Sequence, residues 1–187
     1  MAKTTIQTIK AAKNAKKLVV ITAYDALFAK LIASEADIVL VGDSLAMSFG
    51  GFCDTLSITL DEMIYHTKAV CRGAIDAFVV VDMPFGSCAS AKTALENATR
   101  VYKETNASAV KIEGGAEKAE VIEQLTTNAI AVMGHIGLTP QFARLSGGFR
   151  VQGKDDAAIE KLIEDAKAVE EAGAFAIVLE GVKANAV

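Results

Sequence analysis

The sequence alternates short apolar runs with longer amphipathic segments, and this alternation limits the fold more than any other feature. The runs are five or six residues long and rich in β-branched side chains, which favours strands buried on both faces. They lie at residues 18–23, 37–41, 77–81, 108–112, 130–134 and 175–179. Buried strands joined by helices indicate a parallel sheet with right-handed crossovers, and therefore an α/β fold.

The segments between the runs have apolar residues at the i, i+3 and i+4 spacing of amphipathic helices. They cover residues 27–36, 59–74, 91–105, 116–128 and 155–174. Thr59 followed by Glu62 predicts a capping box, and Gly73 and Gly173 lie where helices should end. Residues 1–20 predict a further amphipathic helix rather than a signal peptide. Residues 136–154 are glycine-rich and have no period, so we expect a functional loop there.

Composition excludes several classes of protein. The chain has 187 residues, of which 52% are hydrophobic, and it contains no Pro/Ser linker, so we expect one domain over residues 1–187. A net charge of −4 argues against binding of nucleic acid, and no apolar run reaches the roughly 18 residues of a membrane helix. Cys53, Cys71 and Cys88 form no C-x-x-C pair, which favours free thiols in a reducing cytoplasm.

Each apolar run ends near a polar side chain that can take part in chemistry. In chain order these residues are Tyr24, Asp25, Asp43, Ser44, Asp82, Lys111, Glu113, His135 and Glu180. Parallel α/β proteins bind their ligands outside the carboxyl ends of the strands, so most of these side chains should lie at one mouth. A cap of the following helix is the alternative role for any single acid, and it fits Asp25 best. Lys111 and Glu113 lie within a strand, where a charge must be paired.

The chemistry of this set suggests a reaction type. Asp43, Asp82 and Glu113 are hard oxygen donors, which suit Mg²⁺. Lys111 beside such an ion would favour an anionic or enolate-like substrate. His135 and Glu180 remain as proton carriers. Together they indicate metal-assisted proton abstraction next to a carbonyl group.

Eight motifs, in order along the chain, carry a family resemblance over residues 4–182. They are "ITAYD", "LVGDSLAM", "DTLSITLDEMIYHTKAV", "VVDMPF", "VKIEGG", "GHIGLTPQ", "GGFRVQGK" and "AGAFAIVLE". The chain resembles the ketopantoate hydroxymethyltransferase family. The resemblance implies a (β/α)₈ TIM barrel of the phosphoenolpyruvate mutase/isocitrate lyase type that forms homo-oligomers. It implies transfer of a hydroxymethyl group from 5,10-methylenetetrahydrofolate to 3-methyl-2-oxobutanoate, through a Mg²⁺-stabilised enolate, to give 2-dehydropantoate.

The resemblance also assigns roles to residues. Asp43 and Asp82 would ligate Mg²⁺, with Glu113 in or next to the same shell. The substrate-binding positions would be Asp43, Ser44, Asp82 and Lys111. Glu180 would be the proton acceptor, with Lys111 and His135 as further catalytic groups in the same mouth.

The chain departs from the family after Glu180, since nothing resembles the seventh and eighth strands of a barrel. From the residues alone, a complete doubly wound sheet of six strands is an alternative to a barrel. Under the resemblance we expect a barrel with about six β/α units, open at strands one and six, in a sequence that is part of a longer chain. Two other functions remain open: a Mg²⁺-dependent C–C or P–C lyase acting on a 2-oxo acid, and an inactive truncated barrel.

Overall fold

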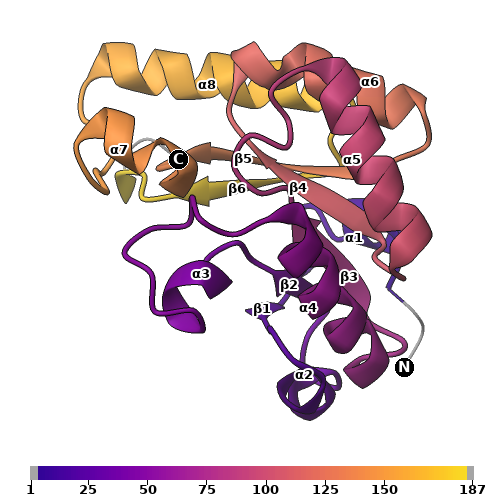
Figure 1. Cartoon of the computed structure of the whole chain (residues 1–187). Helices are drawn as coiled ribbons and strands as arrows, with labels where there is room; N and C mark the ends of the chain where they lie inside the picture. The colour runs from indigo at the N-terminus through magenta and orange to yellow at the C-terminus, as the bar shows by residue number, and fades with distance from the viewer. Residues whose placement is uncertain (1–3, 185–187) are drawn as a thin grey trace.

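Six parallel strands form one sheet, and their order in the sheet follows the chain (Figure 1). The structure is a computed structural model that describes residues 4–184. The strands are β1 (Val20–Thr22), β2 (Ile38–Val41), β3 (Phe78–Asp82), β4 (Ala109–Glu113), β5 (Val132–Gly137) and β6 (Ala176–Glu180). All six predicted runs are therefore confirmed as strands. The sequential order rules out the doubly wound alternative, whose strand order reverses at a switch point, and it is the winding of a barrel.

Helices connect the strands as the periodicity predicts. They are α1 (Ile6–Ala11), α2 (Ala26–Ile32), α3 (Leu45–Ser48), α4 (Leu60–Gly73), α5 (Ala91–Glu104), α6 (Ala119–Thr127), α7 (Ala143–Ser146) and α8 (Asp156–Glu171). Two 3₁₀ turns, η1 (Ala116–Lys118) and η2 (Pro140–Phe142), complete the set. The sequence did not predict α3, α7 or the 3₁₀ turns, because elements this short show no period.

Local sequence signals place the helix ends. Thr59 and Glu62 form the predicted capping box at the start of α4. Asp25 caps α2, since its carboxylate accepts a hydrogen bond of 2.8 Å from the amide of Phe28. The cap interpretation of Asp25 is therefore confirmed. Gly73 ends α4 where the helix touches α2, and a Cβ atom at Gly73 would lie only 2.1 Å from the carbonyl oxygen of Ala26.

The two faces of the sheet have separate cores. The outer face packs against helices, with α4 on β2 and β3 and with α8 on β5 and β6. The inner face is lined by a second apolar cluster, whose buried members are Ile9, Ile38, Phe78, Val80, Ala109 and Met133. Because Ile9 comes from α1, that helix covers the amino-terminal end of the inner face. The carboxyl ends of β5 and β6 point toward the side where α3 and α7 lie (Figure 1).

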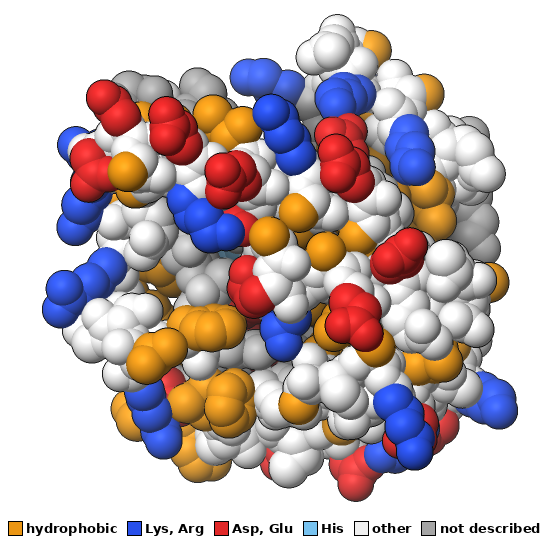
Figure 2. Space-filling view, turned by 90° about the horizontal axis from the view of Figure 1, so that it is seen from above, with side chains coloured by type: hydrophobic (Ala, Val, Ile, Leu, Met, Phe, Trp, Pro, Cys, Tyr) orange, Lys and Arg blue, Asp and Glu red, His pale blue; other side chains and the backbone are white. Residues whose placement is uncertain are grey.

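The two edge strands are less buried than the inner strands. Every residue of β3 and β4 is buried, whereas the last two residues of β6 are exposed and Val20 of β1 is 49% exposed. The expectation of open edges at strands one and six is therefore confirmed. In the part of the chain that the structure describes, no helix is long and apolar enough to cross a membrane. Acidic and basic side chains are interspersed over the face seen in Figure 2.

Candidate active site

Asp82 and Lys111 form a buried ion pair at the carboxyl ends of β3 and β4. The two residues are partners in the register of these strands, which places their side chains next to each other on the inner face. Lys111 Nζ lies 2.7 Å from Asp82 Oδ1, and both residues are at most 5% exposed. The prediction that the charge of Lys111 is paired within the sheet is therefore confirmed.

Asp43 joins this pair from the end of β2. It is 2% exposed, and its backbone amide donates a hydrogen bond of 3.1 Å to Asp82 Oδ2. Burial and the neighbouring Asp82 carboxylate raise the pKa of Asp43 to about 7. Burial alone would lower the pKa of Lys111, but the carboxylates of Asp82 and Glu113 outweigh it and raise that pKa. Lys111 is therefore a cation at neutral pH, held among acids.

His135 lies between two carboxylates and connects the cluster to the edge strand. Glu113 and His135 are register partners on β4 and β5, with Nδ1 3.6 Å from Glu113 Oε1. On the other side of the ring, Nε2 lies 3.3 Å from Glu180 Oε2. Neither ring nitrogen, nor Glu113 Oε1, makes a hydrogen bond within residues 4–184. His135 is 2% exposed, so these buried polar atoms are available to a proton, a ligand or water.

Ser44 lies at the rim of the same mouth. Its hydroxyl is 2.9 Å from the hydroxyl of Tyr24, which follows β1. Ser44 also precedes α3, but its side chain makes no cap hydrogen bond to that helix. The Ser44 hydroxyl therefore contacts Tyr24 rather than the amides of α3. The fold brings together all the predicted site residues, namely Asp43, Ser44, Asp82, Lys111, Glu113, His135 and Glu180, at the carboxyl ends of β2 to β6.

Gln141 is a further member of the site that sequence reasoning missed. Its side-chain amide donates hydrogen bonds to Asp43 Oδ2 at 2.8 Å and to the carbonyl oxygen of Met83 at 3.0 Å. Its backbone amide donates to Glu113 Oε2 at 3.0 Å. Gln141 belongs to η2, within the predicted functional loop at 136–154. The length of that loop indicated a role, but no periodicity singled out one residue in it.

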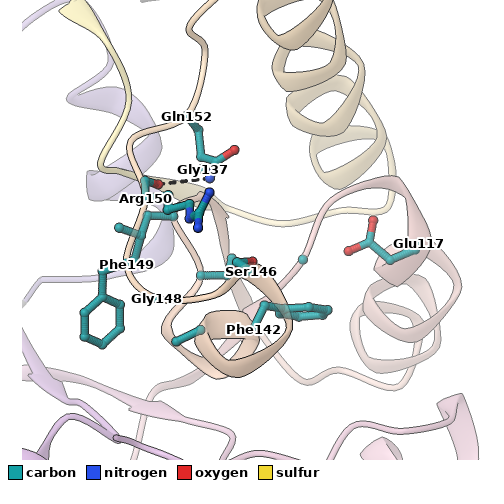
Figure 3. A pocket seen from close by; sticks show the side chains of 12 residues that line it. Glu117, Gly137, Phe142, Ser146, Gly148, Phe149, Arg150 and Gln152 are labelled. Carbon is teal, nitrogen blue, oxygen red and sulfur yellow. Dashed lines mark hydrogen bonds between the residues drawn. The ribbon is translucent and has the colours of Figure 1, made fainter.

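The same loop forms one wall of a cavity beside the acid cluster. The cavity measures about 210 Å³ and lies between the turn after β4 and residues 137–152. Phe142, Phe149 and Arg150 are among its lining residues (Figure 3). Arg144, on α7 in this loop, holds the segment before α4 through two contacts of 2.8 Å from its guanidinium to Asp54 Oδ2. Two loops far apart in the sequence are thus tied together.

The donor set fits a hard divalent cation. Asp43, Asp82 and Glu113 are buried side by side, and the single ammonium of Lys111 pairs directly with only one of these three carboxyl groups, Asp82. Carboxylate oxygens are the ligands that Mg²⁺ prefers, and a divalent cation would pair with the other two carboxyl groups. Within residues 4–184, no three His, Cys, Asp or Glu side chains form a group that could hold a metal ion as they stand. Substrate oxygens and water would have to complete the coordination, as is usual for Mg²⁺.

Solved structures share this fold at low sequence identity. The chain superposes on 2,3-dimethylmalate lyase, a member of the PEP mutase/isocitrate lyase superfamily, with a TM-score of 0.66 and 16% identity. It superposes on phosphonopyruvate hydrolase in complex with oxalate and Mg²⁺ with a TM-score of 0.71 and 15% identity. These matches cover 97% and 94% of this chain but only 63% and 62% of the two solved chains. The predicted TIM-barrel fold is confirmed, with six parallel strands in barrel order.

Sequence comparison gives a narrower assignment. The family model described as ketopantoate hydroxymethyltransferase matches residues 3–187. The 3-methyl-2-oxobutanoate hydroxymethyltransferase of Wolinella succinogenes is 62% identical over 185 residues, which are 99% of this chain and 71% of that protein. A family-model match over nearly the whole chain, together with this identity, confirms the resemblance drawn from the motifs. The chain belongs to the ketopantoate hydroxymethyltransferase family.

Proposed function

We propose that the mouth described above transfers a hydroxymethyl group from 5,10-methylenetetrahydrofolate to 3-methyl-2-oxobutanoate, giving 2-dehydropantoate. The observation that carries this proposal is the buried carboxylate–lysine cluster next to the His135–Glu180 pair. One half of the site can hold a 2-oxo acid, and the other half can take a proton from it. The family name of close relatives supports the same reaction.

The inner strands supply the binding half of the site. Asp43 and Asp82, with Glu113 beside them, would hold Mg²⁺, and Ser44 would bind the acid at the rim. The ion would supply a Lewis acid that makes the C–H bond next to the keto group more acidic. Lys111 stays charged and lies within 2.7 Å of Asp82, so its ammonium stabilises negative charge that develops on the substrate oxygens.

Glu180 is the proton acceptor in this proposal. Its side chain is 48% exposed at the carboxyl end of β6, so the carboxylate can reach a substrate from the open side of the mouth. The C3–H bond breaks, its proton goes to Glu180, and its electron pair forms the new bond to the methylene carbon of the folate. This attack breaks the bond from the methylene carbon to one folate nitrogen, which takes up the proton held by Glu180. Water then breaks the bond to the second nitrogen: its oxygen becomes the hydroxyl group, one of its protons goes to that nitrogen, and tetrahydrofolate leaves. His135 is the further catalytic group beside it, since Nε2 lies 3.3 Å from Glu180 Oε2.

The cavity in Figure 3 is the place we propose for the folate donor. It adjoins η2, which touches the acid cluster, and it offers aromatic side chains for a flat ring and Arg150 for a carboxylate. A photoreactive folate analogue should therefore label residues 142–150. Labelling only at a distant segment would contradict this placement.

The cellular location and the oligomeric state of the protein are proposed from the family resemblance together with two features of the structure. We propose a cytoplasmic homo-oligomer, since the three cysteines are free thiols and α2 exposes Leu27, Phe28 and Leu31. Light scattering would measure the oligomeric state, and a monomer at micromolar concentration would contradict this part of the proposal.

Deuterium exchange at C3 of 3-methyl-2-oxobutanoate tests the first chemical step. With Mg²⁺ and without folate, the protein should catalyse exchange, and the folate donor should then give 2-dehydropantoate. A second candidate is a lyase acting on a 2-oxo acid, which the fold shared with phosphonopyruvate hydrolase favours. Cleavage of a 2-oxo acid without any folate dependence would support the lyase, and absence of both activities would contradict both.

A further inference from the structure

Each of the three buried carboxylates has one oxygen held by an N–H group. Asp82 Oδ2 accepts from the backbone of Asp43, and Asp43 Oδ2 accepts from the side chain of Gln141. Glu113 Oε2 accepts from the backbone of Gln141. In each case the second oxygen remains for a cation, for Lys111 or for His135. Gln141 therefore supplies two of the three hydrogen bonds that orient the acids.

The local sequence places both donors of Gln141 on the cluster. Pro140 begins η2, and Gln141 follows it in the first turn. Backbone amides in the first turn of a helix have no partner within the helix, so the amide of Gln141 is free to donate to the acid cluster. The orientation of the side-chain amide is fixed, because both of its contacts, Asp43 Oδ2 and the carbonyl of Met83, are acceptors. Only the NH₂ group can face them.

We propose that Gln141 is a positioning residue that couples occupation of the acid cluster to closure of the loop at residues 137–152. The proposal rests on the metal-binding role given to the cluster under the proposed function. Gln141 joins the ends of β2, β3 and β4 to the loop that walls the cavity in Figure 3. A cation that fixes Asp43 and Glu113 also fixes the acceptors of Gln141, and therefore the loop.

This coupling is reciprocal, as thermodynamic linkage requires. If the bound cation stabilises the closed loop, then the closed loop strengthens binding of the cation by the same factor. Loss of the amide of Gln141 should weaken both effects together. Outer partners of metal ligands typically change metal affinity about 10- to 100-fold when they are removed.

Gln141→Leu tests the coupling, because leucine keeps the size of the side chain and removes the amide. The matched control is Gln152→Leu in the same loop, where the side chain donates, among the described residues, only to the carbonyl of Arg150 (Figure 3). The probe is Mn²⁺ or Mg²⁺ alone, measured by calorimetry without substrate. We expect Gln141→Leu to weaken binding about 10- to 100-fold and Gln152→Leu to change it less than about 2-fold.

Trypsin cleavage after Arg144 and Arg150 is the second readout, because it reports the loop and needs no catalysis. The metal should protect these sites from trypsin in the wild type and in Gln152→Leu, but not in Gln141→Leu. A second variant, Gln141→Ala, should behave as Gln141→Leu does. Equal affinity and equal protection in Gln141→Leu and the wild type would overturn the role of Gln141 alone. If the wild type binds neither Mn²⁺ nor Mg²⁺, the metal-binding role proposed for the acid cluster is wrong, and the positioning role of Gln141 is wrong with it.

Discussion

The inner and edge parts of the site differ in how firmly the fold holds them. Asp43, Asp82 and Lys111 are at most 5% exposed and lie on or directly after the inner strands β2 to β4, whereas the Glu180 side chain is 48% exposed on the edge strand β6. The inner part is fixed by core packing and by the pairing of charges, so it is ready to bind before any ligand arrives. Among the described residues, the edge part has no such packing around Glu180, whose side chain meets solvent. In the proposed reaction, substrate binding would use the buried part of the site and proton transfer the exposed part.

Glu180→Gln should distinguish the edge part of the site from the inner part most clearly, because it should lower activity without changing stability or Mg²⁺ affinity. We expect deuterium exchange at C3 to fall about 10²- to 10⁴-fold, because the amide cannot accept the proton. The free energy of unfolding and the Mg²⁺ affinity should stay near the wild-type values, since the side chain is half exposed. The exchange rate by NMR and Kd by calorimetry provide the measurements. Full exchange activity in this variant would show that another base acts.

Lys111→Met should lower the free energy of unfolding as well as the exchange activity, unlike Glu180→Gln. Removing the ammonium leaves Asp82 and its neighbours as uncompensated buried charges, which costs about 3–5 kcal/mol. Urea unfolding near neutral pH should report this loss. The loss should shrink at acidic pH, where the carboxylates take up protons. A variant as stable as the wild type at neutral pH would mean that water reaches the cluster freely.

Asp43 should make the stability of the metal-free protein depend on pH. Its folded-state pKa of about 7 lies above the unfolded value of 3.8, so its contribution is present below about pH 4 and is lost as pH rises to about 7. The loss is on the order of 4 kcal/mol, because the shift is about 3 pKa units and each unit corresponds to about 1.4 kcal/mol. Asp43→Asn should flatten this part of the pH profile in thermal unfolding, as should saturating Mg²⁺. An unchanged slope in the asparagine variant would contradict the raised pKa.

Arg144→Ala should have the smallest effect. The Arg144 side chain is 71% exposed, and pairs of this kind contribute at most about 1 kcal/mol. We expect little change in the midpoint of unfolding but several-fold faster chymotrypsin cleavage after Phe142 and Phe149. Arg150→Ala is the matched control in the same loop, since no ion pair of Arg150 occurs within the described residues. Equal cleavage of the two variants would mean that the pair with Asp54 does not hold the loop.

The sequence predicted the strands, the long helices and the acidic mouth, because each depends on local patterns. Lys111 and Glu113 could be placed on one face from the period of two in a strand, and Asp25 could be identified as a cap. Gln141 could not be found in this way. Its contacts with Asp43 and Met83 cross 98 and 58 residues of chain, and the loop that carries it has no repeating pattern. The raised pKa of Asp43 likewise depends on neighbours that only the folded sheet brings together.

The strand order has a consequence for how the protein is made. Each strand pairs with the strand that precedes it in the chain, from β1 to β6 without a reversal. A nascent chain leaving the ribosome can therefore add one strand and helix at a time to a sheet that already exists, without waiting for a distant partner. The growing edge is always the newest strand, and its exposed backbone is covered by the next unit. Synthesis from the N-terminus thus matches the direction in which this sheet can assemble.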